Sequence, residues 1–255
     1  MISKYIETSF LAFIQGFSEF IPVSSSAHLL IISNLNKFDF SSLQLDICLH
    51  LGSLIAILFY FKNELFKISG NKQILILIIL GSVPLAIVGF IFYKTGMVNE
   101  FRNLKVVAWT TLIFGILLYL ADMMKVRKKI NVDLNIKNIL IIGVFQILAL
   151  IPGVSRAGIV ISASRFLNFD RVESSKIAFY LSIPALGGAS FLSIRDVIKT
   201  NVDFDFIFIF ATLLSFFFSY FTIKFFLIFI KKFSLKIFVY YRIILSIILF
   251  LILYV

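Results

Sequence analysis

Long apolar runs constrain this chain more than any other feature of its sequence. Runs such as Gln73–Phe92, Val106–Leu120 and Phe206–Ile230 supply most or all of the roughly 20 residues that a helix needs to cross a lipid bilayer. Of the 255 residues, 60% are hydrophobic and only 15% are charged, whereas about a quarter of the residues in a typical soluble domain are charged. Because lipid offers no hydrogen bonds to the backbone, each run is predicted to form a helix. The sequence therefore predicts an all-α, polytopic membrane protein.

The net charge of +11 does not indicate a nucleic-acid partner. The basic residues lie in short connectors between apolar runs, such as residues 125–129 and 231–232, and form no contiguous basic face with interleaved aromatic residues. Basic connectors are typical of loops that stay on the cytoplasmic side of a membrane, where they also attract anionic lipid head groups. We therefore expect membrane lipids, and no nucleic acid, as partners.

The sequence lacks the marks of a disulfide-bonded, processed secreted protein. Cys48 is the one cysteine, so an intrachain disulfide framework and a cysteine metal site are excluded. The N-terminal apolar run loosely resembles a signal peptide, but Gln15 and Glu19 interrupt it. We expect this first segment to be part of the mature fold.

Eight apolar segments can be identified, and two of them are broken near the middle. The segments span residues 8–33, 45–61, 74–93, 106–122, 139–166, 177–194, 206–230 and 238–255. The first is broken by Pro22 and the fifth by Pro152-Gly153, and both are polar at the break. Proline removes a backbone donor and clashes with the preceding turn. We predict that each broken segment is a hairpin of two half-helices that enters and leaves the membrane at the same face.

The two broken segments resemble each other, which divides the chain into two halves. Residues 20–25 (FIPVSS) parallel residues 150–156 (LIPGVSR) with one inserted residue, and three plainer apolar segments follow each break. Paired broken segments at corresponding positions are typical of inverted repeats around a site at the membrane midplane. We predict one membrane domain of two inverted-topology repeats, residues 1–124 and 125–255. Each repeat holds a re-entrant helical hairpin and three transmembrane helices.

The distribution of basic residues favours re-entrant hairpins. With both hairpins re-entrant, thirteen basic residues share one side of the membrane and seven the other; with both segments crossing fully, the division is eleven to nine. The stronger bias agrees better with the positive-inside rule. The thirteen are Lys62, Lys67, Lys72, Lys125, Arg127, Lys128, Lys129, Lys137, Arg171, Lys176, Lys231, Lys232 and Lys236. We therefore expect both termini on the outer side.

Ionisable and hydroxyl side chains gather at the first break. Glu19 follows Gln15 by four residues, so both project from one helical face. A carboxylate at membrane depth is costly and usually functional. Serines 24–26 and His28 follow within ten residues of Glu19. A hydroxyl, an imidazole and a carboxylate are the groups that nucleophilic or general acid–base chemistry needs.

The second break contributes groups that bind anions. Arg156 keeps its charge at any relevant pH and can bind phosphate oxygens through two N–H groups. It follows a break at which a half-helix begins, and free N–H groups at such a position also bind anions. If the hairpins meet at the midplane, one set of residues converges there: Glu19, Ser25, His28, Ser155 and Arg156. That set fits phosphoryl transfer, in which positioning and charge neutralisation supply most of the catalysis.

Each of these residues also has an ordinary structural interpretation. A serine cluster after proline is a common helix N-cap, Glu19 could be paired for structure alone, and Arg156 could extend toward a membrane surface. No membrane end lies near Arg156, which weakens the last alternative. His50, the second histidine, is predicted to pack or hydrogen-bond within its own helix.

The two breaks carry the resemblance to a known family. Residues 15–25 (QGFSEFIPVSS) followed by His28 resemble the first signature of the bacterial undecaprenyl-diphosphatases of the bacitracin-resistance type. The second signature resembles three stretches of the chain: Phe145-Gln146, Leu148-Ala149-Leu150 and Pro152-Gly153-Val154-Ser155-Arg156. The stretch Leu51-Gly52-Ser53 and the segment around Pro184 also match, so the resemblance covers nearly the whole chain.

The resemblance implies an activity and a role for each residue. The activity is hydrolysis of undecaprenyl diphosphate to the monophosphate, which recycles the lipid carrier of peptidoglycan synthesis and underlies bacitracin resistance. It implies a divalent cation, Mg²⁺ or Ca²⁺, near Glu19 and Gln15, and a site open to the periplasm from the bacterial plasma (inner) membrane. Ser25 matches a nucleophile and His28 its partner. The residues expected to bind the substrate phosphates are Ser24, Gly153, Ser155 and Arg156.

Three departures from the family pattern affect binding more than reaction type. Ser26-Ala27 stands where the family often has Thr-Gly, Ala157 where a serine usually follows the arginine, and Val160 where threonine is common. Two hydroxyls that could hold the diphosphate are therefore absent. Gln15 is permitted by the family pattern but leaves one carboxylate fewer for a metal ion.

A secondary transporter or flippase of an anionic polyprenyl lipid is the alternative from another class. Broken helices and inverted repeats are transporter architecture, and the same pocket could carry the lipid across the membrane without releasing phosphate. A structural scaffold gives no reason for Glu19 and Arg156. The sequence leaves the oligomeric state open, a homodimer included, and does not decide between a covalent phosphoserine and direct attack by water.

Overall fold

The computed structural model describes residues 2–35, 43–70, 72–124, 128–199 and 205–254. Within these ranges the regular elements are helices, and the one β-type contact is an isolated bridge between Lys128 and Phe169. The helices are α1 (Ile2–Ser18), α2 (Ser25–Leu35), α3 (Leu43–Tyr60), α4 (Lys62–Gly70), α5 (Lys72–Thr95), α6 (Met97–Glu100), α7 (Leu104–Asp122), α8 (Ile130–Asp133), α9 (Ile136–Gln146), the 3₁₀ turn η1 (Ile147–Leu150), α10 (Arg156–Phe166), α11 (Arg171–Lys199), α12 (Phe206–Lys232) and α13 (Lys236–Tyr254). The all-α prediction is confirmed.

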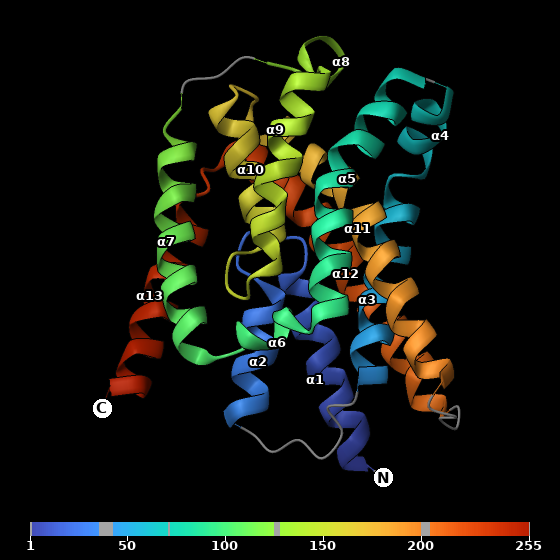
Figure 1. Cartoon of the computed structure of the whole chain (residues 1–255), viewed down its shortest axis with the longest axis vertical. Helices are drawn as coiled ribbons and strands as arrows, with labels where there is room; N and C mark the ends of the chain where they lie inside the picture. The colour runs from blue at the N-terminus through green and yellow to red at the C-terminus, as the bar shows by residue number, and fades with distance from the viewer. Residues whose placement is uncertain (1, 36–42, 71, 125–127, 200–204, 255) are drawn as a thin grey trace.

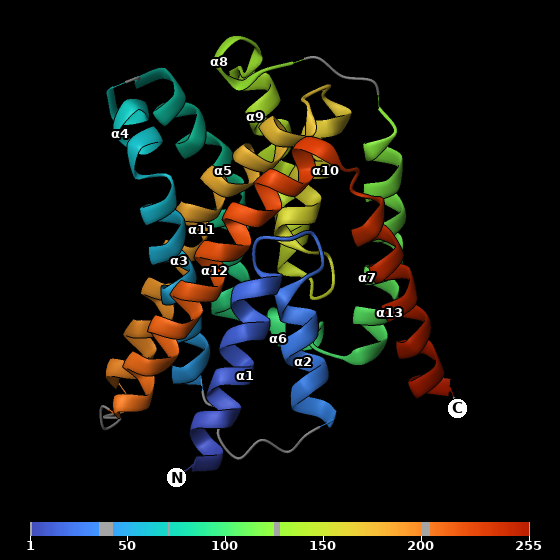
Figure 2. The ribbon, with the colours of Figure 1, turned by 180° about the vertical axis from the view of Figure 1, so that it is seen from behind.

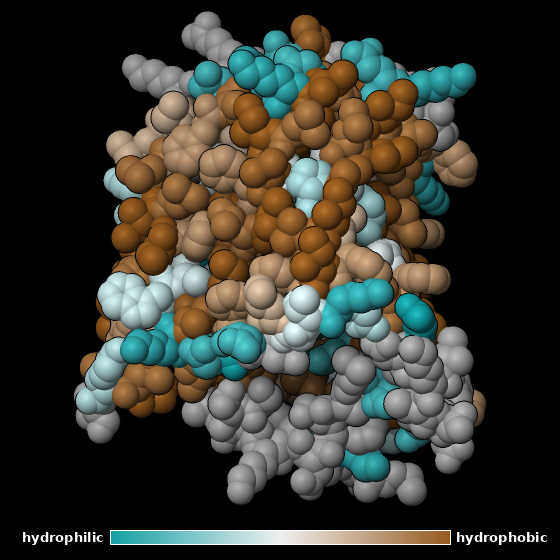
Figure 3. Space-filling model, in the orientation of Figure 1, coloured by the Kyte–Doolittle hydropathy of each residue, from teal (hydrophilic) through white to brown (hydrophobic). Residues whose placement is uncertain are grey.

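The outer surface of the helices is apolar. Five helices in the described ranges are long and apolar enough to cross a membrane, namely α5, α7, α11, α12 and α13. Their outward side chains include Ile79, Leu213 and Phe225, each more than half exposed. Figure 3 shows one face of the molecule as an apolar band with polar residues at its two edges. Soluble proteins rarely expose apolar surface of this extent, so the chain is a multi-pass membrane protein.

Two helical hairpins approach each other from opposite ends of the molecule. α1 runs inward from the N-terminus and α2 returns to the same end, while α9 with η1 runs inward from the other end and α10 returns there (Figures 1 and 2). The tips are residues 19–24 and 151–155, at the breaks predicted from Pro22 and Pro152. Both termini lie at the end from which α1 enters (Figure 1).

Proline alone does not decide where a helix ends. Pro84 and Pro184 lie inside α5 and α11 without ending them. At the two tips, by contrast, the chain adopts a positive φ after the proline: 78° at Ser24, 89° at Gly153 and 70° at Ser155. A residue with a positive φ does not continue an α-helix. The chain therefore leaves the helix at the two tips, whereas it stays helical through the prolines of α5 and α11.

Small residues allow the long helices to cross closely. A Cβ atom added to Gly52 of α3 would lie 2.4 Å from the carbonyl oxygen of Thr212 in α12, and one added to Gly143 of α9 would lie 2.3 Å from that of Gly81 in α5. Both distances are below any van der Waals contact, so only glycine fits. Close crossings of small residues are the usual basis of helix association in membranes.

Arg242 of α13 ties both hairpin tips to the helices around them. The side chain is completely buried and donates hydrogen bonds to four backbone carbonyls. Its Nη1 reaches Pro22 of the first tip at 3.2 Å, its Nη2 reaches Gly153 and Val154 of the second tip at 2.8 and 3.2 Å, and its Nε reaches Thr111 of α7 at 3.2 Å. A break in a helix leaves backbone carbonyls without partners, and lipid cannot donate hydrogen bonds to them. The Arg242 guanidinium donates hydrogen bonds to such carbonyls in both tips.

Replacing Arg242 should therefore destabilise the fold. We expect Arg242→Met to lower the free energy of unfolding by about 2–3 kcal/mol, because the tip carbonyls lose charge-assisted hydrogen bonds. Thermal unfolding of the detergent-solubilised protein, followed by intrinsic fluorescence, measures the change. Arg195→Met, at an exposed arginine of α11, is the matched control. Equal unfolding temperatures for the two variants would contradict this role of Arg242.

Candidate active site

The helices that follow the two tips begin at equivalent residues. Ser24 precedes α2 and Ser155 precedes α10, and both have a positive φ. The Oγ atom of Ser155 accepts a hydrogen bond from the N–H of Gly158 at 3.2 Å, as a helix N-cap does. A serine in this region of φ and ψ costs about 1–3 kcal/mol and persists only where surrounding contacts impose it. The repeat of this geometry gives two helix N-termini at the centre of the molecule, and free N–H groups there attract anions.

An ion pair joins the two hairpins at their tips. Nη2 of Arg156, the first residue of α10, lies 2.7 Å from Oε1 of Glu19 in the first tip. Both side chains are largely buried, with 13% and 6% exposed. These residues lie 137 positions apart in the sequence, so the pair forms only when the two hairpins meet. Glu19 and Arg156 thus converge as the sequence predicted.

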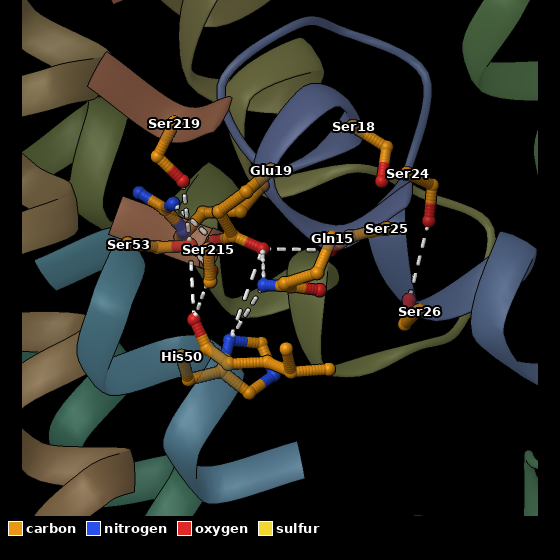
Figure 4. A network of polar contacts seen from close by, with 12 residues as sticks. Gln15, Ser18, Glu19, Ser24, Ser25, Ser26, His50, Ser53, Ser215 and Ser219 are labelled. Atoms are coloured by element: carbon orange, nitrogen blue, oxygen red, sulfur yellow. Dashed lines mark hydrogen bonds and ion pairs between the residues drawn. The ribbon is translucent and has the colours of Figure 1, made fainter. Parts of the chain in front are cut away.

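The second oxygen of Glu19 accepts two more hydrogen bonds. The Ser25 hydroxyl donates to Oε2 at 2.7 Å, and Nε2 of Gln15 donates to the same oxygen at 2.9 Å. Figure 4 shows these side chains pointing toward one another around the carboxylate. The Ser25 hydroxyl therefore faces a group that can accept its proton.

His50 of α3 completes this network. Its Nδ1 lies 2.9 Å from Nε2 of Gln15 and 3.9 Å from Oε2 of Glu19 (Figure 4). Since the Gln15 amide can only donate through Nε2, Nδ1 of His50 is the acceptor in this contact. His50 was predicted to pack or hydrogen-bond within its own helix, and its contact with Gln15 was not predicted. The available signal was its position directly before Leu51-Gly52-Ser53, one of the stretches that resembled the family.

A cavity of about 220 Å³ lies between the tips. Its polar lining includes Ser24, Ser25 and Ser26 from the first hairpin and Ser155 and Arg156 from the second, together with Glu19, Ser18 and His50. Its remaining lining is apolar and comes from α5, η1 and α11. The cavity therefore combines polar groups at the tips with an apolar wall.

His28 does not line this cavity. Its Nδ1 lies 2.6 Å from the carbonyl oxygen of Ser24, and its Nε2 bonds to the hydroxyl of Tyr241 on α13. The two rings are stacked, with centroids 5.7 Å apart. We expected His28 to converge with Ser25, but these contacts hold it on the side of α2 that packs against α13.

Gly153 also lies outside the cavity lining. A Cβ atom added there would lie 2.1 Å from Oγ1 of Thr110, and the Gly153 carbonyl accepts the hydrogen bond from Arg242. The residue thus holds the second tip against α7. Neither placement tests the catalytic or binding roles predicted for His28 and Gly153.

The donor atoms around Glu19 fit a divalent cation only with help from a substrate. In the described ranges no three His, Cys, Asp or Glu side chains gather into a metal-binding group. The Gln15 Oε1 atom, however, is buried and has no hydrogen-bond partner among the described residues. Mg²⁺ is commonly bound by one or two carboxylates together with substrate phosphates. Glu19 and the free amide oxygen of Gln15 suit such a shared site.

Comparison with known proteins identifies the family of this chain. The family described as bacitracin resistance protein BacA matches residues 8–248. An undecaprenyl-diphosphatase of Pelagibacter ubique is 55% identical over 255 residues, which is 100% of both chains. One of Elusimicrobium minutum is 41% identical over 93% of this chain and 94% of its own, and one of Campylobacter curvus is 38% identical over the same shares. The chain belongs to the BacA bacitracin resistance family.

Proposed function

We propose that the protein is an integral-membrane phosphatase that hydrolyses undecaprenyl diphosphate to undecaprenyl phosphate and inorganic phosphate. The observation that carries the proposal is the Glu19 carboxylate, which contacts an arginine from one hairpin and a serine hydroxyl from the other at 2.7 Å each. The relatives that match over all or nearly all of the chain bear the name of this activity. The product would return to peptidoglycan synthesis as a lipid carrier.

Arg156 and the helix N-termini supply the positive charge for the diphosphate. The Arg156 side chain lines the cavity and is 13% exposed, and its Nη2 forms the ion pair with Glu19. The first N–H groups of α2 and α10 have no partner within their helices. Ser24 and Ser155 turn these two helix starts toward one cavity. A phosphate between them would accept hydrogen bonds from both hairpins. This suits phosphoryl transfer, in which the transition state spreads negative charge over three equatorial oxygens.

Ser25 is the proposed nucleophile, with Glu19 as its base. Oγ of Ser25 attacks the terminal phosphorus while its proton passes to Oε2 of Glu19, 2.7 Å away. The bond from that phosphorus to the bridging oxygen breaks, and undecaprenyl phosphate leaves. Water then attacks the phosphoserine, releases phosphate and restores Ser25, and Glu19 takes part in the proton transfer. Direct attack by water, with Ser25 only binding phosphate, is the alternative.

A divalent cation completes the proposal. Glu19 and the Oε1 atom of Gln15 would hold Mg²⁺ or Ca²⁺ together with the substrate phosphates. When bound, the cation supplies positive charge that neutralises the diphosphate. Gln15 also donates to Glu19 through its other amide atom, so the same side chain orients the carboxylate.

The membrane arrangement proposed is two inverted repeats, residues 1–124 and 125–255. Each would hold one re-entrant hairpin and three spanning helices: α5, α7 and the shorter apolar helix α3 in the first, and α11, α12 and α13 in the second. Two hairpins that enter from opposite ends and the thirteen-to-seven charge bias support it. By the positive-inside rule the termini lie outside the bacterial plasma membrane, and we place the opening of the cavity on that side.

A lipid flippase is the second candidate, because hairpins that meet from opposite ends are also found in transporters. A flippase would move the polyprenyl lipid between the leaflets of a vesicle without releasing phosphate. The apolar wall of the cavity is compatible with both. The proton acceptor beside Ser25 favours hydrolysis, since transport needs no such pair.

Phosphate release from undecaprenyl diphosphate in detergent tests the activity. We expect Arg156→Ala and Glu19→Gln each to lower kcat/KM by on the order of 10²–10³, because each removes charge or a proton acceptor at the reacting phosphate. EDTA should lower the wild-type rate, and added Mg²⁺ or Ca²⁺ should restore it. Arg195→Ala is the control for loss of a positive charge. Wild-type protein that is folded yet releases no phosphate would favour the flippase.

Ser25 can be tested against its neighbour. We expect Ser25→Ala to lower kcat by at least about 10³, whereas Ser26→Ala changes it little, because Ser26 bonds to Ser24 and not to Glu19. Rapid quenching during turnover of substrate labelled at the terminal phosphorus should leave label on the peptide that contains Ser25. A mild loss in Ser25→Ala together with no labelled peptide would establish direct attack by water.

A further inference from the structure

The side-chain amide of Gln15 lies between two hydrogen-bond acceptors from different parts of the chain. Its Nε2 atom is 2.9 Å from Oε2 of Glu19 in the first tip and 2.9 Å from Nδ1 of His50 in α3. The two acceptor atoms are 3.9 Å apart. A glutamine Nε2 carries two hydrogens, so one hydrogen serves each acceptor. Because the Gln15 side chain is also completely buried, its amide has one favourable orientation.

The same two neighbours oppose the reverse orientation of the amide. Reversal would turn Oε1 of Gln15 toward Oε2 of Glu19, and two acceptors in contact share no hydrogen. It would also take the donor away from Nδ1 of His50. In the observed orientation Oε1 points away from both side chains (Figure 4) and is buried without a hydrogen-bond partner among the described residues. A side-chain carbonyl oxygen of this kind is a ligand that Mg²⁺ and Ca²⁺ accept.

α12 holds the helices of Gln15 and His50 at this distance. A Cβ atom added to Gly16, the residue after Gln15 in α1, would lie 2.9 Å from the backbone nitrogen of Ser219 in α12. The Ser219 hydroxyl lies 3.0 Å from that of Ser53 in α3, and both serines are completely buried. Figure 4 shows both serines in the same group of side chains as His50. One residue of α12 therefore contacts both helices, and this platform sets the distance at which His50 meets Gln15.

We propose that His50 is a positioning residue, which holds the Gln15 amide so that Oε1 is available to the divalent cation beside Glu19. The inference rests on the proposed function and on the cation that belongs to it. In this role His50 acts through Gln15, by accepting one of the two amide hydrogens. Residues that orient a metal ligand in this way typically contribute about 10- to 100-fold to metal affinity.

Binding of Mn²⁺ tests the inference without catalysis, since Mn²⁺ takes the same oxygen ligands as Mg²⁺. It is measured by EPR in detergent with a methylene-diphosphonate analogue of the substrate, and the analogue without protein is the blank. We expect His50→Leu to weaken Mn²⁺ binding by about tenfold or more, because Gln15 loses an acceptor. His50→Asn, whose Oδ1 can accept in place of Nδ1, should stay within about threefold of the wild type. A tenfold loss in folded His50→Asn would overturn the proposal.

A double-mutant cycle separates positioning of the amide from packing of α3. Gln15→Ala removes the amide, so His50→Leu added to it should change Mn²⁺ affinity by less than about twofold. A packing defect in α3 would weaken binding by the same factor whether or not the amide is present. Equal factors in the two backgrounds would overturn the proposal, and so would His50→Leu protein that binds Mn²⁺ as the wild type does.

Phosphate release from the same preparations separates this inference from the activity. Coupling between His50 and Gln15 in Mn²⁺ binding, with no phosphate release by the wild-type protein, would support the role of His50 and count against the phosphatase. Wild-type protein that releases phosphate and binds no Mn²⁺ would retain the phosphatase and overturn the role of His50.

Discussion

The centre of this protein depends on the hydrogen bonds that the buried guanidinium of Arg242 donates to both hairpin tips. Two helices are interrupted deep inside an apolar molecule, and an interrupted helix leaves carbonyl oxygens without partners. Arg242 donates to carbonyls of Pro22, Gly153 and Val154 and thereby satisfies both interruptions at once. A buried cation is costly by itself, and the carbonyl oxygens of the tips compensate for that cost. The hydrogen bonding of both tips therefore depends on their meeting at Arg242 of α13.

This arrangement explains why the polar groups meet where they do. Once the tips are held together, Ser24 and Ser155 keep their positive φ and start two helices at one cavity. Glu19 and Arg156 then lie close enough for an ion pair that neither hairpin could form alone. A preformed set of donors and acceptors in a buried site does not have to reorganise when charge develops on a phosphate. The free energy that holds these groups in place comes from folding, before substrate binds.

Local signals in the sequence were enough to predict the breaks and part of the site. Proline followed by serine or glycine in an apolar run identified both tips, and Glu19, Ser25 and Arg156 stood out because charged and hydroxyl groups are rare at membrane depth. His28 carried the same signal, yet its ring packs on Tyr241. The contacts of Arg242 and His50 were not predicted, since they depend on which face of α13 or α3 turns toward the tips.

The central claim is that the diphosphate binds between the two hairpin tips. The most direct test is the distance from phosphorus to the Arg156 guanidinium nitrogens, measured by solid-state NMR with a non-hydrolysable methylene-diphosphonate analogue in lipid. Arg156→Lys assigns the signal, because it removes only that guanidinium. We expect a strong phosphorus–nitrogen coupling, at hydrogen-bond distance, that disappears in Arg156→Lys. A coupling that persists unchanged in Arg156→Lys, or bound analogue with no coupling to any arginine, would contradict it.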